Sequence, residues 1–228
     1  MFDSVNVIGA GRVGSAVNAR LVERGVELRD GAELVLLCVP DAAISEVART
    51  LEPGPWIAHV SGATSLGALA PHTCRFGVHP LQTFTRRGGA EQLDGAWAAV
   101  TAESDDARRR GHWLAGTLGL RPFDLDDDAR PLYHAGAAIA SNYLVTLHAA
   151  ATRLFRAADA PPEALLPLMT RTIEGGFELT GPIARGDFET VERHVAAIRE
   201  AAPDLEPMYE ALAAATAVLA RREPLVGR

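Results

Sequence analysis

The sequence of 228 residues contains no lysine, because all 22 of its basic residues are arginine. This absence excludes the GxxxxGK[ST] phosphate loop of NTPases and every mechanism that needs a lysine Schiff base or a lysine general acid. Proton transfer near neutral pH would fall first to the seven histidines. The 29 acidic residues give a net charge of −7, which argues against a nucleic-acid binder.

Cysteine and uninterrupted hydrophobic runs are also scarce. Cys38 and Cys74 both lie in apolar stretches, and with no signal peptide we expect two reduced, buried thiols in a cytoplasmic protein. The segments 53–74 and 131–152 carry no formal charge, but proline and glycine interrupt the first, and histidines, Ser141 and Asn142 interrupt the second. We therefore expect no membrane span, and we interpret 131–152 as a buried helix. No residues are assigned as metal ligands.

Two different patterns divide the chain. Up to residue 124, short apolar runs alternate with helical patterns, which predicts a doubly wound, mostly parallel α/β sheet. The expected strands are 5–8, 34–39, 56–60, 75–79 (ended by Pro80), 97–101 and 121–124, and the expected helices are 12–24, 42–51, 65–70 and 105–118. Beyond residue 128 all signals are helical, at about 128–158, 162–179, 187–201 and 204–222. The sequence thus predicts an α/β domain over 1–124 and an all-α domain over 125–228.

A glycine-rich loop follows the first predicted strand. Residues 9–14 read GAGRVG, which fits GxGxxG between a strand and a helix. Glycines let the backbone turn tightly and approach a pyrophosphate, while the start of the helix offers free N–H groups. The alternative is a tight turn that binds nothing.

The next part of a dinucleotide fold is shortened. Residues 26–30 are the only candidate for its second strand, and only Gly31, Ala32 and Glu33 separate them from the following strand. A parallel crossover needs about a dozen residues. The second crossover is therefore expected to be absent or collapsed into a short antiparallel piece, which truncates the adenosine subsite. Whether Arg29 or Asp30 meets a ribose stays open.

Polar residues lie at the ends of three of the predicted strands. Asp41 and Ser61 belong to the segments Val39-Pro40-Asp41 and Ser61-Gly62, which follow two strands, and His79 ends the third. Ligands of open α/β sheets bind outside the carboxyl ends of the strands, so these residues are expected to converge on one site. For His79 a site role is favoured over a structural one; for His59 the structural role is favoured.

A second polar group lies on the uncharged helix. On an α-helix His134 and Ser141 lie within about 20° of one line, and Asn142 lies about 80° from His134. This stripe is either a core hydrogen-bond network or a substrate face on which His134 exchanges a proton and Asn142 orients a carbonyl. In the loop 179–187, Asp187 is expected to cap the next helix, and Arg185 is free to reach a carboxylate or a phosphate. His194 is interpreted as a packing residue.

These segments carry a resemblance. The loop at 9–17, HPLQTF at 79–84, HAGAAIASNYLVTL at 134–147 and LTGPIARGD at 179–187 resemble a group of NAD(P)-dependent oxidoreductases. In that group a Rossmann-like domain precedes a helical domain of the 6-phosphogluconate dehydrogenase C-terminal-like superfamily. Ketopantoate, pyrroline-5-carboxylate and prephenate reductases or dehydrogenases are more distant relatives.

The resemblance implies a homodimer joined through its helical domains, with NADP or NAD and a small oxo or imino acid meeting in a cleft between domains. Carried over by position, the resemblance puts Gly9, Gly11 and Gly14 on the pyrophosphate, Asp41 and Ser61 along the cofactor, and His79, His134 and Asn142 at the substrate. The full set of candidates from the sequence is His79, His134 and Asn142 for catalysis; Ser141, Thr180 and Arg185 for the substrate; and Gly9, Gly11, Arg12, Val13, Gly14, Val39, Pro40, Asp41, Ser61 and Gly62 for the cofactor. The alternative is a degenerate Rossmann protein that binds a nucleotide or metabolite without catalysis. Relatives place a lysine where this chain offers only His134. Proton transfer therefore falls to His134 or His79, and we expect activity to depend on pH near neutrality.

Overall fold

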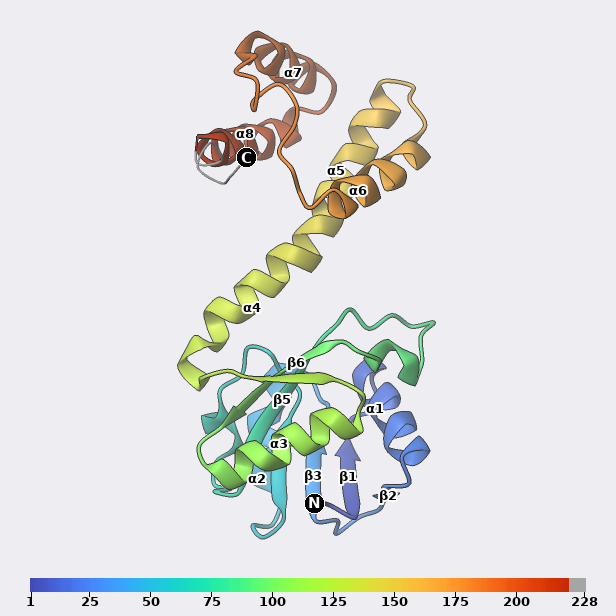
Figure 1. The fold of residues 1–228 in the computed structure, drawn as a ribbon, viewed down its shortest axis with the longest axis vertical. Coiled ribbons are helices and arrows are strands. Elements are labelled where there is room, and N and C mark those ends of the chain that lie inside the picture. The colour runs from blue at the N-terminus through green and yellow to red at the C-terminus, as the bar shows by residue number, and fades with distance from the viewer. Residues whose placement is uncertain (222–228) are drawn as a thin grey trace. The chain divides into compact units, whose positions relative to one another are not determined.

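The computed structural model describes residues 1–221. The chain divides into two compact units, and the boundary along the sequence lies between Ser141 and Asn142. The first unit contains a sheet and the helices that cover it (Figure 1). Its elements are β1 (Ser4–Ile8), α1 (Arg12–Glu23), β2 (Glu27–Leu28), β3 (Leu34–Leu37), α2 (Asp41–Thr50), β4 (Trp56–His59), the 3-10 helix η1 (Leu66–Leu69), β5 (Arg75–Leu81), η2 (Ala90–Leu93), β6 (Trp97–Ala102), α3 (Asp105–Thr117), β7 (Arg121–Asp124), η3 (Asp127–Ala129) and α4 (Arg130–Ala138).

Within residues 1–221, seven strands form one sheet in the order β2-β1-β3-β4-β5-β6-β7. All neighbouring strands are parallel except β5 and β6, which run antiparallel. One core cluster packs the sheet against α1 and α3 through Val17, Leu21 and Leu114. Another packs the opposite face against α2 and η1 through Ile44, Leu66 and Leu69. The predicted doubly wound, mostly parallel sheet is confirmed.

The helical second crossover is absent, which is one of the two outcomes expected from the sequence. β2 has only two residues, and it pairs parallel to β1, so the alternative of an antiparallel piece is wrong. Leu28 and Leu34 flank Val5 on its two sides, a separation of about 10 Å. The short segment 29–33 spans this distance without a helix, and it is held to β1 by the bond from the Glu33 N–H to Ser4 Oγ (3.2 Å).

β5 continues through Pro80 to Leu81, two residues further than predicted. The pairing of β5 with β4 ends at Gly77, while its pairing with β6 runs on to Leu81. Beyond Gly77 the strand therefore has a partner on one side only, and proline is tolerated at such an edge. His79 consequently lies inside β5 rather than at its end.

The first unit extends beyond the domain boundary predicted at residue 124. The last strand does end at Asp124, but α4 belongs to the same compact unit, because Arg130 and Tyr133 bond to residues of the sheet and its loops. The predicted helix 128–158 is also not uniform, and the interpretation of 131–152 as a buried helix is wrong, since Leu132, Ile139 and Val145 are exposed. A π-helical turn at Ile139–Tyr143 separates α4 from α5 (Leu144–Ala157). The α-helical angles expected between His134, Ser141 and Asn142 therefore do not apply.

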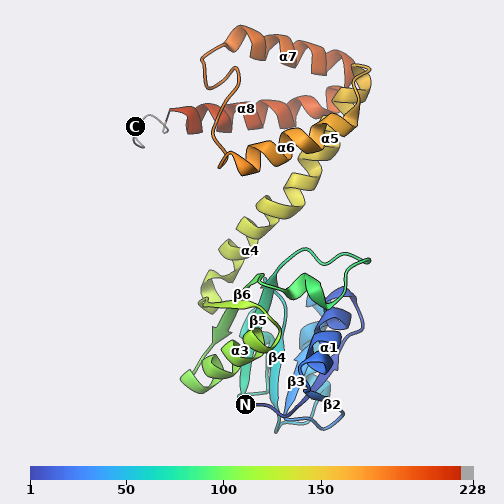
Figure 2. The same cartoon turned by 45° about the vertical axis from the view of Figure 1, so that its right-hand side comes forward.

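The second unit is helical, as predicted. Besides α5 it contains η5 (Pro162–Ala164), α6 (Leu165–Glu174), α7 (Phe188–Ala201), η6 (Pro203–Leu205) and α8 (Glu206–Ala220) (Figure 2). Asp187 caps α7, accepting from the Thr190 N–H at 3.1 Å, as expected. α6 ends at Glu174, earlier than predicted, because Gly176 and Phe177 adopt positive φ angles.

Two further expectations concern the whole chain. No helix among residues 1–221 combines the length and the hydrophobicity needed to cross a membrane. Both cysteines are free; Cys38 is buried, but Cys74 is exposed, so the expectation of two buried thiols is wrong for Cys74. Cys74 lies just before β5 in a surface turn.

Candidate functional site

The three glycines of the loop 9–14 differ in the space around them. Gly9 has a φ of +122°, and a Cβ there would lie 2.4 Å from the carbonyl oxygen of Cys38. A Cβ on Gly14 would lie 1.9 Å from the carbonyl oxygen of Gly9, so Gly14 lets α1 pack closely against the loop. A Cβ on Gly11 would meet nothing within 4 Å. This open space leaves room for a ligand to approach the backbone of Gly11 closely.

The start of α1 is open as well. Gly11 is the N-cap residue, has an extended backbone and provides no side-chain cap. The helix begins at Arg12, whose guanidinium donates to the carbonyl of Phe84 at 3.0 Å. Arg12 thus ties the glycine loop to the segment that follows β5. Val13 lies in the first turn of α1 and packs partly against the core.

The predicted strand-end residues lie on neighbouring strands. Val39 and Pro40 follow β3, and Asp41 begins α2. Ser61 and Gly62 follow β4. The hydroxyl of Ser61 accepts bonds from the N–H groups of Ala63 and Thr64, so it stabilises its own turn.

The two histidines predicted to act in catalysis lie side by side in the first unit. The ring centroids of His79 and His134 are 6.2 Å apart. Gly62 fits between them, since a Cβ on it would lie 2.7 Å from Cε1 of His79 and 2.8 Å from Cδ2 of His134. The structure thus joins three residues that are far apart in the sequence.

Tyr133 completes this cluster. Its Oη hydrogen bonds to Nδ1 of His79 at 2.8 Å, and its ring meets that of Phe123 edge to face. Among residues 1–221, Nε2 of His79 has no hydrogen-bond partner, so this atom is available to a ligand. The sequence analysis did not identify Tyr133; its place one residue before His134 was the available signal.

Burial keeps the side chains of His79 and Tyr133 uncharged at neutral pH. Burial, followed by the neighbouring His134 and Arg130, lowers the pKa of His79 to about 4, while Asp41 acts in the opposite direction. Burial also raises the pKa of Tyr133 to about 12. For His79 the expected titration near neutrality is therefore corrected to a lower pH, because the ring is neutral at pH 7.

Arg130 was missed by sequence reasoning. It lies at the start of α4, is fully buried, and donates to the carbonyl oxygens of Ser61 (2.7 Å) and Thr64 (2.9 Å). A Cβ on Gly77 would come within 2.9 Å of its Nη2, so the glycine makes room for the guanidinium. The sequence shows only an arginine after three aspartates, which resembles a solvated helix start.

His59 lies beneath the site, in β4. Its side chain is fully buried, and neither ring nitrogen has a hydrogen-bond partner among the described residues. Burial, together with the charge of Arg130, lowers its pKa to about 3. The structural role favoured from the sequence stays a prediction, because the buried ring makes no hydrogen bond in the described part of the chain.

The predicted substrate residues are divided between the units. Ser141, in the π-helical turn, lies 3.0 Å from Thr83 through its hydroxyl, within the first unit. Asn142, Thr180 and Arg185 belong to the second unit and are exposed. Their expected meeting with the histidines stays a prediction.

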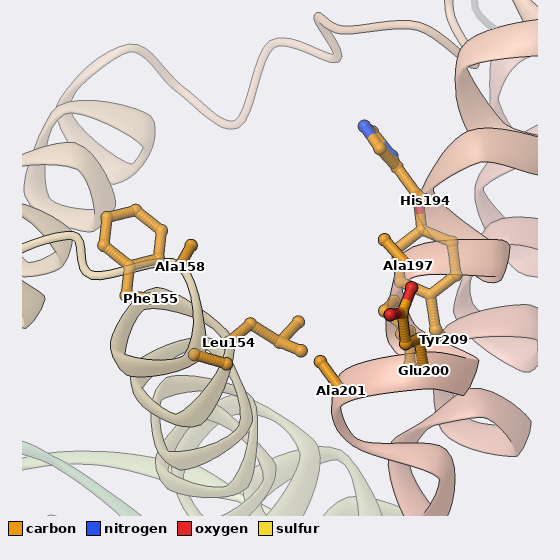
Figure 3. A pocket seen from close by; sticks show the side chains of 10 residues that line it. Leu154, Phe155, Ala158, His194, Ala197, Glu200, Ala201 and Tyr209 are labelled. Atoms are coloured by element: carbon orange, nitrogen blue, oxygen red, sulfur yellow. The ribbon is translucent and has the colours of Figure 1, made fainter.

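The second unit has a pocket of its own, of about 930 Å³ (Figure 3). It is lined mainly by apolar side chains of α5 and α7, including Leu154, Phe155 and Ile198. His194 and Tyr209 lie at its edge and hydrogen bond at 2.7 Å. His194 therefore has a packing partner, in line with its interpretation from the sequence.

Comparison with known proteins identifies the family. A family described as a domain of unknown function (DUF2520) matches residues 96–216, and a Rossmann-like domain matches residues 22–84. The first match spans more than half of the chain. The protein belongs to the DUF2520 family. A comparison of this DUF2520 protein with curated protein sequences finds no significant match.

Solved structures resemble this DUF2520 protein over nearly its whole length. A protein from Bacteroides fragilis assigned as an NADP oxidoreductase has a TM-score of 0.78 at 21% identity, covering 94% of this chain and 97% of that one. A reductive aminase from Aspergillus terreus, in complex with NADPH and ethyl levulinate, has a TM-score of 0.64 at 17% identity, covering 91% of each chain. The 1-pyrroline-5-carboxylate reductase of Streptococcus pyogenes has a TM-score of 0.59 at 15% identity, covering 95% and 97%. At these identities the likeness establishes a shared fold.

Proposed function

We propose that this DUF2520 protein is an NAD(P)-dependent oxidoreductase that transfers hydride between a nicotinamide and a small oxo or imino acid. The observation that carries the proposal is the open space at Gly11, in a loop whose other two glycines are fixed by backbone contacts. The fold shared with an NADPH-bound reductive aminase and with pyrroline-5-carboxylate reductase supports it.

The glycine loop fits a dinucleotide. Gly11 and the uncapped start of α1 would hold the pyrophosphate through backbone N–H groups, and Val39 to Asp41 and Ser61 to Gly62 would flank the rest of the cofactor. When bound, the nicotinamide would donate or accept the hydride. We infer NADP or NAD, with a weak adenosine subsite, because Asp30 bonds to Asn6 and Arg29 bonds to Glu27 and to the Gly31 carbonyl.

The histidine cluster would serve the substrate. Nε2 of His79 is the free atom, and as part of a neutral ring it can donate a hydrogen bond to a carbonyl oxygen or an imine nitrogen. We assign proton exchange to His134, with Ser141 and Asn142 orienting the reacting group. We assign Thr180 and Arg185 to the carboxylate, since a guanidinium binds carboxylates in a bidentate manner.

The proposal is tested by measuring whether the Gly11→Asp variant still binds NADPH or NADH. Aspartate is a favourable N-cap residue, so the variant should fold as well as the parent, while its carboxylate fills the open space with negative charge. The matched control is Gly116→Asp, at another exposed glycine whose Cβ would meet nothing within 4 Å. We expect NADPH or NADH to raise the melting temperature of the parent and of the control, but not of Gly11→Asp. An unchanged melting temperature of the parent with millimolar NADPH and NADH would refute the proposal.

A second candidate function is binding without turnover, as a sensor or an assembly component. The observation that favours it is the two-residue β2 and the missing crossover, which shorten the nucleotide site. The two candidates differ in one measurement. Oxidation of NADPH or NADH with small oxo acids, in the presence and absence of ammonium, should be detectable for an oxidoreductase; nucleotide binding without any turnover favours the second candidate.

We also propose that the partner of the chain is a second copy, joined through the second unit. Large apolar side chains there are exposed on several helices, among them Val145 (69%), Leu166 (65%) and Leu168 (60%). Surfaces of this kind are typical of subunit interfaces. The mass in solution, measured by sedimentation equilibrium, should be that of a dimer.

A further inference from the structure

Arg130 is the largest fully buried side chain among residues 1–221. A buried guanidinium is costly unless its donors are satisfied, so its partners show what it holds. Nη2 and Nε donate to the carbonyl oxygens of Ser61 and Thr64, and Nη1 lies 3.4 Å from the hydroxyl of Thr101. Two of these three partners belong to the turn that follows β4.

Asp127 strengthens the same connection. Its carboxylate lies 3.5 Å from Nε of Arg130 and accepts the N–H of Leu66 at 3.0 Å and 3.1 Å through its two oxygens. The segment 61–66 is therefore attached to the segment 127–130 at three points. Gly62, which touches both His79 and His134, lies inside the attached segment.

We propose that Arg130 is a positioning residue for His79: it anchors the segment 61–66, and with it Gly62, against which the His79 ring lies, so that Nε2 of His79 stays open to the substrate. The substrate part of this inference rests on the proposed function. The arrangement on β5 agrees with this inference. Gly77, which makes room for the guanidinium, precedes His79 by two residues, so the two residues lie on the same face of the strand.

The charged and titratable groups that face His79 come from three elements. Arg130, Tyr133 and His134 face it from α4, Asp41 from α2, and His59 from β4. Only Asp41 favours the protonated ring. Arg130 is the member whose positive charge persists at every pH at which proteins fold.

Histidine NMR of the full chain without nucleotide tests this role. Arg130→Gln removes a positive charge that lowers the pKa of His79, and we expect that pKa to rise. Arg130→Lys keeps the charge and should leave that pKa within about 0.3 unit of the parent value, although it loses the paired carbonyl bonds. Both variants should speed amide exchange at Leu66.

The matched control is Arg20→Gln. Arg20 is also a buried arginine of the first unit, and it donates to the Ala90 carbonyl and to Asp94, away from His79. Its loss should lower the melting temperature and leave the His79 titration unchanged. If Arg130→Gln and Arg20→Gln gave the same His79 pKa, Arg130 would be a merely structural residue and the inference would be overturned.

Asp127→Asn keeps the inference testable if Arg130→Gln does not fold. This variant removes the negative charge that lies 3.5 Å from the guanidinium and weakens the attachment of the segment 61–66. Amide exchange at Gly62 should therefore become faster, and the NMR signals of the His79 ring should shift. Unchanged exchange together with unchanged ring signals would overturn the inference. Because no nucleotide is present, these outcomes are independent of whether NADPH binds to the parent, which decides the proposed function separately.

Discussion

The two units of this DUF2520 protein bury their apolar side chains to very different degrees. In the first unit, β3 alone buries Leu34, Leu36 and Leu37 completely, and core clusters fill both faces of the sheet. In the described part of the second unit, 142–221, the buried apolar side chains are Ala150, Leu165, Ile198 and Ala202. Burial is the main stabilising term in folding. The first unit thus contains its own core, whereas the described part of the second leaves most of its large apolar side chains exposed.

The chain provides a probe that separates the units. Its three tryptophans, Trp56, Trp97 and Trp113, all belong to the first unit. Tryptophan fluorescence therefore reports unfolding of the first unit alone. Far-UV ellipticity reports the helices of both, so a difference between the two signals is assigned to the second unit.

The largest effect is expected from a leucine deletion in the first core. Leu36→Ala should lower the free energy of unfolding by about 2 to 5 kcal/mol in urea titrations followed by fluorescence, since it leaves a cavity in the central sheet. Leu168→Ala, at a side chain that is 60% exposed in the second unit, should change the same transition by less than about 0.5 kcal/mol. Equal losses would mean that the two units share one core.

Acid should weaken the first unit through His59. Its pKa is lowered to about 3 in the folded state from 6.5, so the unfolded chain takes up the proton first as the pH falls. The stabilisation is complete above pH 6.5 and is lost between about pH 6.5 and 3, at up to about 1.4 kcal/mol per pH unit. His59→Gln should flatten the pH dependence of the fluorescence transition. The same slope in parent and variant would contradict this assignment.

Self-association should depend on the second unit alone. Val145→Asp introduces a charge at an exposed apolar position of α5, and we expect at least about a tenfold weaker dimer in sedimentation equilibrium. Val22→Asp is the matched control, because Val22 is 62% exposed on α1 of the first unit. If both substitutions weakened the dimer equally, the prediction that the interface is formed by the second unit alone would be contradicted.

The sequence predicted local structure better than it predicted the site. Strand 121–124, the start of α1 and the cap at Asp187 follow from periodicity and from the chemistry of glycine and aspartate, which act over a few residues. The pairing of His79 with Tyr133 and the burial of Arg130 depend on contacts between residues 54 and 69 positions apart. A buried arginine also contradicts the composition rule that places charge at the surface.

The π-helical turn shows a second limit of sequence patterns. Nothing in IASNY at 139–143 interrupts an α-helical periodicity, yet the extra residue per turn changes which side chains share a face. Ser141 is thereby placed beside Thr83. The predicted alignment of Ser141 with His134 was based on a spacing that the helix does not keep.

The smallest effects are expected from two helix caps, one in each unit. Ser104 caps α3 by accepting from the Ala107 N–H at 3.2 Å, and Asp187 caps α7 in the same way. Ser104→Ala should lower the fluorescence-detected unfolding free energy by about 1 kcal/mol. Asp187→Ala should leave the fluorescence transition in place and shift only the ellipticity transition, while Asp187→Asn, which retains an acceptor, should behave as the parent. A shift of both signals by Asp187→Ala would show that the units unfold together, and the independence inferred from their unequal burial would then be wrong.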